Sequence, residues 1–311
     1  MPLIFGSSAL HDPAALHDFV AGAMPRPEFT RVLMVDPEHF QVRYEINPHM
    51  AGQAGTVDPA AARREWQLVR DAYESLGYEV LVMDGSPDFP DLVFAANQSL
   101  PYAGGDSPAP RAILSRMAKA ERRVEVALMD AFLRRHGFQT QTLSLGQFEG
   151  TGDILWHPGH ALAWGGHGFR SRLETLENVA AIARIRLIPL KLIDERCYHL
   201  DVCLMPVNET TAFACRAAFD EESWARLKAG FANLIEADEN ETMNHFALNG
   251  HCPDGKHLLL PAGNPKTRAA AERLGLTVHE LSTREFQKAG GSIFCLKNML
   301  PSAVMQIPEE S

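Results

Sequence analysis

Five short segments of this sequence carry residue types that can perform covalent or acid–base chemistry. They are more polar or richer in glycine than the sequence around them, and they span residues 44–48, 90–97, 148–153, 197–201 and 290–295. The Cys295 thiol could serve as a nucleophile and the His199 imidazole as its base. The Glu149 and Asp201 carboxylates could orient that base and face a substrate. Together these side chains predict an enzyme, provided that the loops that carry them meet in one place.

Each of these residues also has an ordinary structural explanation when it is taken alone. A lone cysteine such as Cys295 is usually a small buried hydrophobe. A strand-like alternation would place His199 and Asp201 on one face as a simple polar pair. Glu149 and Asp153 could cap a helix or close a turn. The combination of a nucleophile, a base and carboxylates in different segments favours a shared site over these separate explanations.

Other chemical sites are not indicated by the sequence. His245, His251 and Cys252 match no zinc-binding spacing and are more typical of a polar loop. A serine triad would need a G-x-S-x-G turn, and a dinucleotide site would need G-x-G-x-x-G after a strand; neither pattern is found. We therefore expect no metal and no cofactor.

Composition limits the class of protein. The chain has 311 residues, of which 46% are hydrophobic and 22% charged, as is typical of a folded globular protein. Its 29 Lys and Arg against 39 Asp and Glu give a net charge of −10, which argues against nucleic acid as a partner. No apolar run reaches the ~18 residues of a membrane span, and residues 1–6 lack the features of a secretory signal. Five cysteines without a C-x-x-C pair favour free thiols in a reducing cytoplasm.

A repeated unit of strand, amphipathic helix and strand must position the five segments. Leu128, Ala131 and Phe132 show the spacing of one buried helix face. Arg122 and Arg123 are expected on the solvated face of that helix, where they could pair with Glu125. Five such units are predicted, at residues 31–35, 59–76 and 78–82; 112–114, 122–136 and 138–145; 160–164, 172–182 and 184–192; 211–215, 221–231 and 233–237; and 257–260, 265–274 and 276–281.

The number of units bears on how they are arranged. Each unit alone exposes its apolar face, so neighbouring units must cover one another. Five units favour a closed ring, because a ring needs no capping repeats. A doubly wound sheet has the same alternation, and periodicity alone does not exclude it. Residues 1–311 are expected to form a single domain, with the loop ends converging at one mouth of the ring.

The motifs in these segments resemble those of the guanidine-modifying, or pentein, superfamily, which includes arginine deiminases, dimethylarginine dimethylaminohydrolases, amidinotransferases and arginine dihydrolases. The resemblance covers residues 32–300 and implies an α/β fold, a five-bladed α/β propeller with pseudo-fivefold ββαβ repeats. Its strongest marks are Phe148-Glu149-Gly150-x-Gly152-Asp153, His199-Leu200-Asp201 and Gly290-Gly291-x-x-x-Cys295, in that order.

Within the superfamily the sequence is most similar to the cyanobacterial-type arginine dihydrolases. It shares their E-I-N-P segment at 45–48 and their V-F-x-A-N segment at 93–97. It also shares the pairs Ser115-Arg116 and Arg170-Ser171. Deiminases and amidinotransferases carry Asp at the position of Asn97, and dimethylarginine hydrolases lack the counterpart of Asp201. The resemblance thus implies hydrolysis of arginine to ornithine, carbon dioxide and two molecules of ammonia.

The resemblance also implies a role for each site residue. Cys295 would form a covalent thiouronium with the guanidinium carbon, His199 would transfer protons, and Glu149 would hold the imidazole. The substrate-binding residues would be Asp201, Asn97, Asn47, Arg116, Arg170 and Asp153.

Several alternatives stay open. An amidinotransferase is the first, followed by a dimethylarginine dimethylaminohydrolase or an arginine deiminase, and a non-catalytic arginine-binding module is the least favoured. The expected partner is a small guanidino compound such as arginine rather than nucleic acid or membrane, and a homo-oligomer is left open.

Overall fold

The computed structural model describes residue 4, residues 13–103 and residues 109–301. Residues 1–6, whose composition argues against a secretory signal, lie outside these ranges apart from residue 4. In the described ranges no helix is long and apolar enough to cross a membrane. The helices are α1 (Pro13–Ala21), α2 (Pro59–Ser75), α3 (Glu125–Arg135), α4 (Gly150–Asp153), α5 (Leu173–Ala183), α6 (Glu221–Gly230), α7 (Glu239–His245), α8 (Pro265–Arg273) and α9 (Arg284–Gln287). The strands are β1 (Arg31–Val35), β2 (Glu79–Met83), β3 (Ser99–Tyr102), β4 (Arg111–Leu114), β5 (Gln139–Thr142), β6 (Ile154–Trp156), β7 (Leu162–His167), β8 (Arg186–Lys191), β9 (Leu204–Pro206), β10 (Thr211–Ala214), β11 (Asn233–Glu236), β12 (His257–Pro261), β13 (Thr277–Leu281) and β14 (Lys297–Leu300).

The described strands pair into five small sheets, and each sheet contains one of the predicted units. Their strand orders are β14-β1-β2, β3-β4-β5, β6-β7-β8, β11-β10-β9 and β12-β13. In every sheet a helix joins two parallel strands, as α2 joins β1 to β2, because parallel neighbours need a crossover connection. In four sheets a third strand pairs antiparallel with the first of these two. In the fifth sheet, the antiparallel bridge between His251 and Leu259 takes that place. The fold class is therefore α/β, built from ββαβ units.

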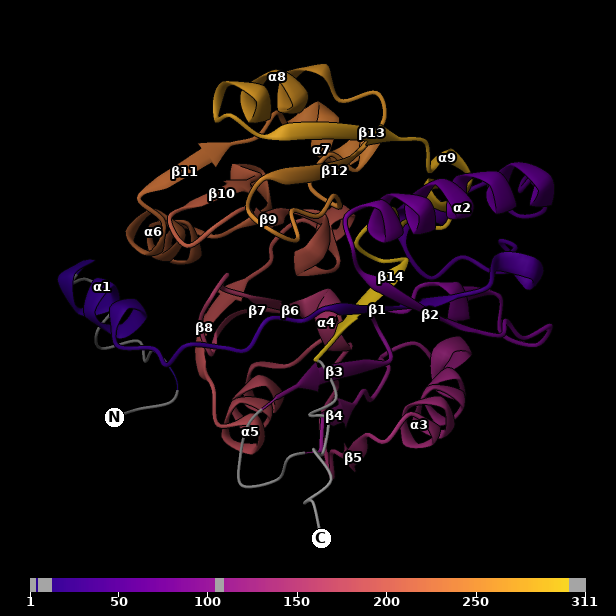
Figure 1. The fold of residues 1–311 in the computed structure, drawn as a ribbon, viewed down its shortest axis with the longest axis horizontal. Coiled ribbons are helices and arrows are strands. Elements are labelled where there is room, and N and C mark those ends of the chain that lie inside the picture. Colours follow the sequence, from indigo (N-terminus) through magenta and orange to yellow (C-terminus); the bar gives the residue numbers. More distant parts are fainter. Residues whose placement is uncertain (1–3, 5–12, 104–108, 302–311) are drawn as a thin grey trace, which may run out of the picture.

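Helices surround the sheets in Figure 1, where α2, α3, α5, α6 and α8 lie around the outside and the strands lie nearer the middle. Helix α2 shows why the sequence folds in this way. Asp58 caps its start by accepting hydrogen bonds from two backbone amides of the first turn. Trp66, Val69 and Tyr73 form its buried stripe. Residues 32–35 of the adjacent strand β1 are fully buried, as expected for a parallel strand covered on both faces.

The predicted units agree with the structure to within a few residues, with two corrections near the expected chemical residues. The segment 197–201 is not a strand, since 3₁₀ turns form at Glu195–Cys197 and Leu200–Val202. The Leu200 N–H donates to Asp153 Oδ1, so it cannot join a strand ladder. The apolar run after Gly290-Gly291 favours a strand that ends at Cys295, but Cys295 lies in a turn before β14.

Turns with polar residues precede the third strand of four sheets and the His251 bridge of the fifth. These strands are only three or four residues long, so they were not predicted from the sequence pattern. Each turn enters its strand at the corresponding place in the unit, so the repeats deliver their polar residues to equivalent positions. The residues are Asn97 before β3, Glu149 and Asp153 before β6, His199 and Asp201 before β9, Asn249 before the His251 bridge, and Cys295 before β14.

Candidate active site

Hydrogen bonds join the five turns in a closed cycle. Each turn donates to or accepts from the next, and the last returns to the first, so the polar residues of distant segments lie side by side. In order round the cycle the bonds are Ala96 N to Cys295 O, Thr151 N to Ala96 O, Leu200 N to Asp153 Oδ1, Asn249 Nδ2 to Asp201 O and Phe294 N to Asn249 O, with lengths of 2.8–3.2 Å.

Glu149 and His199 form a buried pair in this cluster. His199 Nε2 lies 2.7 Å from Glu149 Oε2, and both side chains are at most 1% exposed. Glu149 also accepts the Ala118 N–H at 2.8 Å and a bond from Arg170 Nη1 at 3.1 Å. Burial alone would raise the pKa of Glu149, but the His199 hydrogen bond and the Arg170 charge outweigh it and hold the pKa well below its usual range. An ionised Glu149 therefore fixes the imidazole through Nε2 and leaves Nδ1 for chemistry.

Cys295 and Asp201 form the second buried pair. The thiol donates to Asp201 Oδ2 over 3.2 Å, and Asn249 Nδ2 donates to the sulfur over 3.2 Å. Asn249 also uses Oδ1 to accept the backbone N–H groups of Ser292 at 2.8 Å and of Cys295 at 3.3 Å. The amide of Asn249 thus holds both the sulfur and the turn that carries it. Asn249 was not among the residues predicted from the sequence.

The charges around this pair oppose formation of a thiolate in the free protein. Burial raises the pKa of Cys295 well above its usual range, and the Asp201 carboxylate raises it further. Burial also raises the pKa of Asp201 to about 7, although the hydrogen bond from Cys295 and the charge of Lys297 act in the opposite direction. Lys297 is itself buried, which lowers its pKa to about 7 against the opposing effects of Asp201 and Cys295. A cationic ligand at Asp201 would reverse this balance in favour of the thiolate.

Three buried polar atoms of the cluster have no hydrogen-bond partner among the described residues: Asp201 Oδ1, His199 Nδ1 and Asn97 Nδ2. Gly152 brings two of these groups together. A Cβ at position 152 would collide with Asn97 Nδ2 and would lie 3.3 Å from the His199 ring. Because an unpaired buried polar atom costs free energy, these atoms point to a polar ligand that enters the cluster.

Arg122 sets the orientation of Asn97. Its Nη1 donates to Asn97 Oδ1 at 2.8 Å, so the amide presents Nδ2 to the cluster. Arg122 is 4% exposed and pairs with the fully buried Glu125 at 2.9 Å. The expectation that Arg122 lies on a solvated face is therefore wrong. The pairing with Glu125 that the sequence indicated is present, but it lies in the core and not on a solvated face.

Asp153 and Asn47 lie beside the two pairs and support the turns. Asp153 accepts the Ser171 hydroxyl at 2.6 Å as well as the Leu200 N–H, and burial raises its pKa to about 7. Asn47 caps a short turn by accepting the N–H of residue 49 at 3.0 Å and donates to the Ala289 carbonyl at 3.0 Å. These contacts tie the segments 148–153 and 44–48 to the cluster.

The two arginines expected to bind a substrate carboxylate differ in their placement. Arg170 is buried, donates to Glu149 and to the Ile46 carbonyl, and lies with its guanidinium carbon 4.7 Å from the Tyr198 ring centre. Arg116 is exposed, and its guanidinium donates to the carbonyls of residues 143 and 146. No side-chain hydrogen bond in the described ranges links Arg116 to the other expected site residues.

Metal binding receives no support from the described residues, among which no group of three or more His, Cys, Asp or Glu side chains is arranged to hold an ion. His251 instead accepts or donates a hydrogen bond with Tyr73 at 2.9 Å. His245 ends helix α7 instead of lying in a loop, whereas His251 bridges to Leu259 in the fifth sheet. Between them, Asn249 contributes to the cluster.

Comparison with known proteins gives a consistent family. Residues 36–298 match the protein family described as N,N dimethylarginine dimethylhydrolase, eukaryotic. The chain is 32% identical to ZK1307.1 of Caenorhabditis elegans over 86% of this chain and 92% of that protein. It is 31% identical to the bifunctional arginine dihydrolase/ornithine cyclodeaminase ArgZ of Synechocystis, over 86% of this chain and 37% of ArgZ. The chain therefore spans little more than a third of that relative.

Solved structures agree with the sequence matches. The N-terminal domain of ArgZ, bound to substrate, superposes with a TM-score of 0.81 at 29% identity, over 88% of this chain and 98% of that domain. A dimethylarginine dimethylaminohydrolase at 22% identity has a TM-score of 0.71 and shares the fold. The similarity to ArgZ is thus confined to its N-terminal domain and covers nearly all of it.

Proposed function

This chain belongs to the N,N-dimethylarginine dimethylhydrolase family of guanidine-modifying enzymes, and we propose that it is a cysteine-dependent arginine dihydrolase. The reaction would convert arginine and two waters to ornithine, carbon dioxide and two ammonia. One observation carries the proposal: a thiol, a carboxylate with a free oxygen, and an imidazole held by a second carboxylate lie in one buried cluster. A planar guanidinium offers the N–H donors that Asp201 Oδ1 lacks and the carbon that a thiolate attacks.

The first round of hydrolysis uses groups whose positions follow from the cluster. The guanidinium pairs with Asp201, and its charge favours the Cys295 thiolate, whose proton passes to His199 Nδ1. The sulfur bonds to the guanidinium carbon, and His199 returns the proton to the nitrogen that leaves as ammonia. The imidazole then takes a proton from water, whose oxygen bonds to the thiouronium carbon while the C–S bond breaks. The product is the ureido group of citrulline.

The second round needs a site that tolerates a neutral ureido group. Position 97 holds an amide where deiminases and amidinotransferases carry a carboxylate, so Asn97 Nδ2 would offer the substrate a neutral donor in addition to the Asp201 carboxylate. Attack of Cys295 on the ureido carbon releases the second ammonia and leaves a thiocarbamate. Water cleaves the C–S bond, and the resulting carbamate decomposes to ornithine and carbon dioxide.

The substrate's amino acid end would lie against segment 44–48 and its neighbours. Asn47, Arg170 and Arg116 are proposed for its carboxylate, since a guanidinium fork suits that group. Arg170 is already shared between Glu149 and Ile46, so it would act mainly by positioning Glu149. Arg116 would have to release two backbone carbonyls before it could reach a ligand.

The decisive experiment is to incubate the purified protein with arginine and to quantify ornithine, citrulline, urea and ammonia. We expect ornithine and ammonia in a ratio of one to two, and no urea. Citrulline as the final product, with one ammonia per arginine, would refute the dihydrolase assignment.

Hydrolysis of dimethylarginine is the second candidate function. The matching family and a 29% identical dimethylarginine dimethylaminohydrolase of Mycobacterium tuberculosis favour it. Asp201 argues against this alternative, because the sequence resemblance implies that dimethylarginine hydrolases lack its counterpart. Release of dimethylamine from asymmetric dimethylarginine, at a rate above that of ammonia from arginine, would select this alternative.

We also infer that the five sheets form the blades of a five-bladed propeller in one domain of residues 1–311. The cycle of hydrogen bonds through all five turns supports this arrangement. A crystal structure in which the sheets do not surround one axis would contradict it. A cytoplasmic location, catalysis without a cofactor and homo-oligomerisation stay predictions, and sedimentation of the purified protein would test the last.

A further inference from the structure

A second cavity, of about 650 Å³, lies apart from the candidate active site. Its wall includes the segment 26–30 that leads into β1, the turn before β2, and the ends of β6, β9 and β14. The catalytic candidates do not line it, but Phe294 and Lys297, on either side of the turn of Cys295, do. This volume falls in the range of sites for small molecules. The cavity thus borders the residues that flank Cys295, although Cys295 itself does not line it.

Lys297 is the feature of this cavity that most needs explanation. Its side chain is 2% exposed, and no hydrogen bond from its ammonium is found in the described part of the chain. The ammonium lies 3.2 Å from the centre of the Phe294 ring, a contact that only partly replaces lost hydration. A buried ammonium without an acceptor favours an anionic ligand, since an unpaired buried charge is costly. Asp201 and Cys295 are the acidic groups that influence Lys297 within the protein, and burial still lowers its pKa to about 7.

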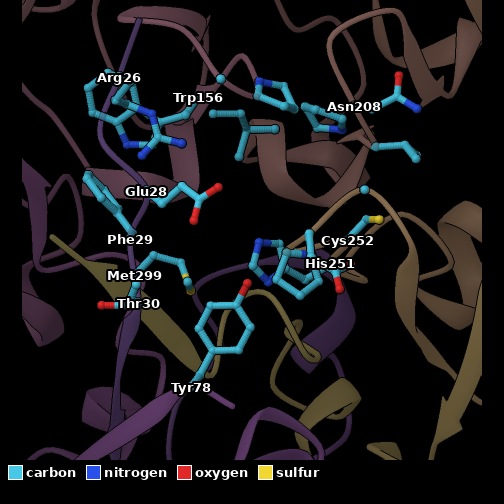
Figure 2. Close-up of a pocket in the computed structure, with 18 of the residues that line it drawn as sticks. Arg26, Glu28, Phe29, Thr30, Tyr78, Trp156, Asn208, His251, Cys252 and Met299 are labelled. Carbon is cyan, nitrogen blue, oxygen red and sulfur yellow. The ribbon is translucent and has the colours of Figure 1, made fainter. Parts of the chain in front are cut away.

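Carboxylates also line the cavity, and Glu28 is one of them. Figure 2 shows the Glu28 carboxylate pointing into the cavity, with Tyr78 and Trp156 on two sides of it. Arg26 is less available, because its guanidinium stacks 4.3 Å from the centre of the Phe29 ring and 5.1 Å from that of Trp156. The lining of the cavity thus includes a cation, a carboxylate and aromatic rings.

We propose that this cavity binds a small zwitterion, with its carboxylate at Lys297 and its ammonium near Glu28. The ligand is of the size of a free amino acid, and its carbon chain packs against Tyr78 and Trp156. The carboxylate gives Lys297 the acceptor that it lacks in the chain. Since Lys297 acts on Asp201 and Cys295, occupation of the cavity changes the charge felt by the candidate active site from behind.

The experiment uses 5-aminovalerate as the probe, because it has both charges and lacks the α-amino carboxylate that the active site would recognise. Because the free thiol of Cys252 lines the cavity, the full chain carries Cys252→Ser and is then alkylated at Cys295 to block the active site, with mass spectrometry to show that the modification is complete. Binding is followed by tryptophan fluorescence and by calorimetry. We expect a dissociation constant in the millimolar range or tighter, weakened about tenfold in Lys297→Met and about threefold in Glu28→Gln. Lys256→Met is the matched control, since Lys256 also lines the cavity but is exposed, and it should bind as the wild type does.

Two related probes separate the charges and do not depend on the folding of a variant. Valerate, which keeps the carboxylate, should bind more weakly than 5-aminovalerate, and pentylamine should not bind. No binding of 5-aminovalerate up to about 50 mM, or pentylamine binding as well as valerate, would overturn the proposal. Equal loss of binding in Lys297→Met and Lys256→Met would overturn the assignment of the carboxylate to Lys297.

Discussion

The Cys295 sulfur lies 3.2 Å from one oxygen of Asp201, and the other oxygen of Asp201 has no hydrogen-bond partner among the described residues. Asn249 fixes this relationship by donating to the sulfur and to the Asp201 carbonyl. The same carboxylate therefore suppresses the thiolate in the free protein and is available to receive a cation. Substrate charge, rather than the resting site, would then activate the nucleophile.

Asp201→Asn is expected to separate these two effects. Because burial and then the Asp201 charge raise the pKa of Cys295, removal of the charge should lower that pKa. Alkylation of Cys295 by iodoacetamide at about pH 8 should accelerate about tenfold, while hydrolysis of arginine is lost. Mass spectrometry of the Cys295 peptide gives the rate, with Asp254→Asn as the control. A rate at or below that of the wild type would contradict the suppression by Asp201.

Lys297→Met should change the pH dependence of catalysis. Burial raises the pKa of Asp201 to about 7, and the positive charge of Lys297 acts in the opposite direction by lowering it. Without that charge the pKa rises, so that less Asp201 is ionised at a given pH. The midpoint of the rise of kcat/KM with pH should move up by about one unit, with the largest loss below neutral pH, where Lys297 is charged. Lys256→Met should leave the midpoint unchanged, and a downward shift in Lys297→Met would exclude this role.

The sequence predicted the connecting helix and the two parallel strands of each unit, because these elements are long enough for their apolar pattern to be recognised. The antiparallel strands β3, β6, β9 and β14 have only three or four residues, which is too short for an alternation of apolar and polar residues to be recognised. The reactive residues directly precede these strands. Four of the five turns were still recognised, because they carry Asn97, Glu149, His199 and Cys295 in glycine-rich or polar motifs. The fifth turn was missed, since Asn249-Gly250 reads as an ordinary turn. Because five units were predicted and four polar turns were recognised, the missing fifth turn could have been looked for in the fifth unit.

Asn97→Asp should move the product of the reaction towards citrulline. Arg122 Nη1 would pair with the new carboxylate and keep it ionised, which adds a second negative charge near Asp201. Such a site favours the guanidinium cation over the neutral ureido group, so citrulline would leave before the second round. The ratio of citrulline to ornithine at full consumption of arginine measures the effect, with Asn208→Asp in the second cavity as the control. An unchanged ratio would remove Asn97 from the explanation of the second round.

Arg122→Met should destabilise the protein by breaking its buried pair with Glu125. The lost partner leaves Glu125 buried without its counter-ion, which costs about 3–5 kcal/mol in the free energy of unfolding. The double variant Arg122→Met/Glu125→Met should recover part of that loss. Arg134→Met on helix α3 is the control, because its pair with Asp130 is exposed and contributes under about 1 kcal/mol. Urea denaturation measures all of these, and equal effects at Arg122 and Arg134 would contradict the buried pairing.

Gly152→Ala and Gly150→Ala should fail in different ways although the two glycines are neighbours in helix α4. The backbone of Gly150 has φ +58°, and a Cβ there would lie 2.6 Å from the Ala96 carbonyl oxygen, so alanine is strained and should lower the Tm. Gly152 has no positive φ, and its Cβ would instead collide with Asn97 Nδ2 beside His199. Gly152→Ala should therefore keep the Tm within a few degrees while kcat/KM for arginine falls at least about tenfold, because the amide and the imidazole are displaced from their working positions. Thermal melting and steady-state kinetics on the two variants decide the matter. A loss of stability in Gly152→Ala equal to that in Gly150→Ala, with activity lost in proportion, would mean that Gly152 serves the fold and not the positioning of Asn97 and His199.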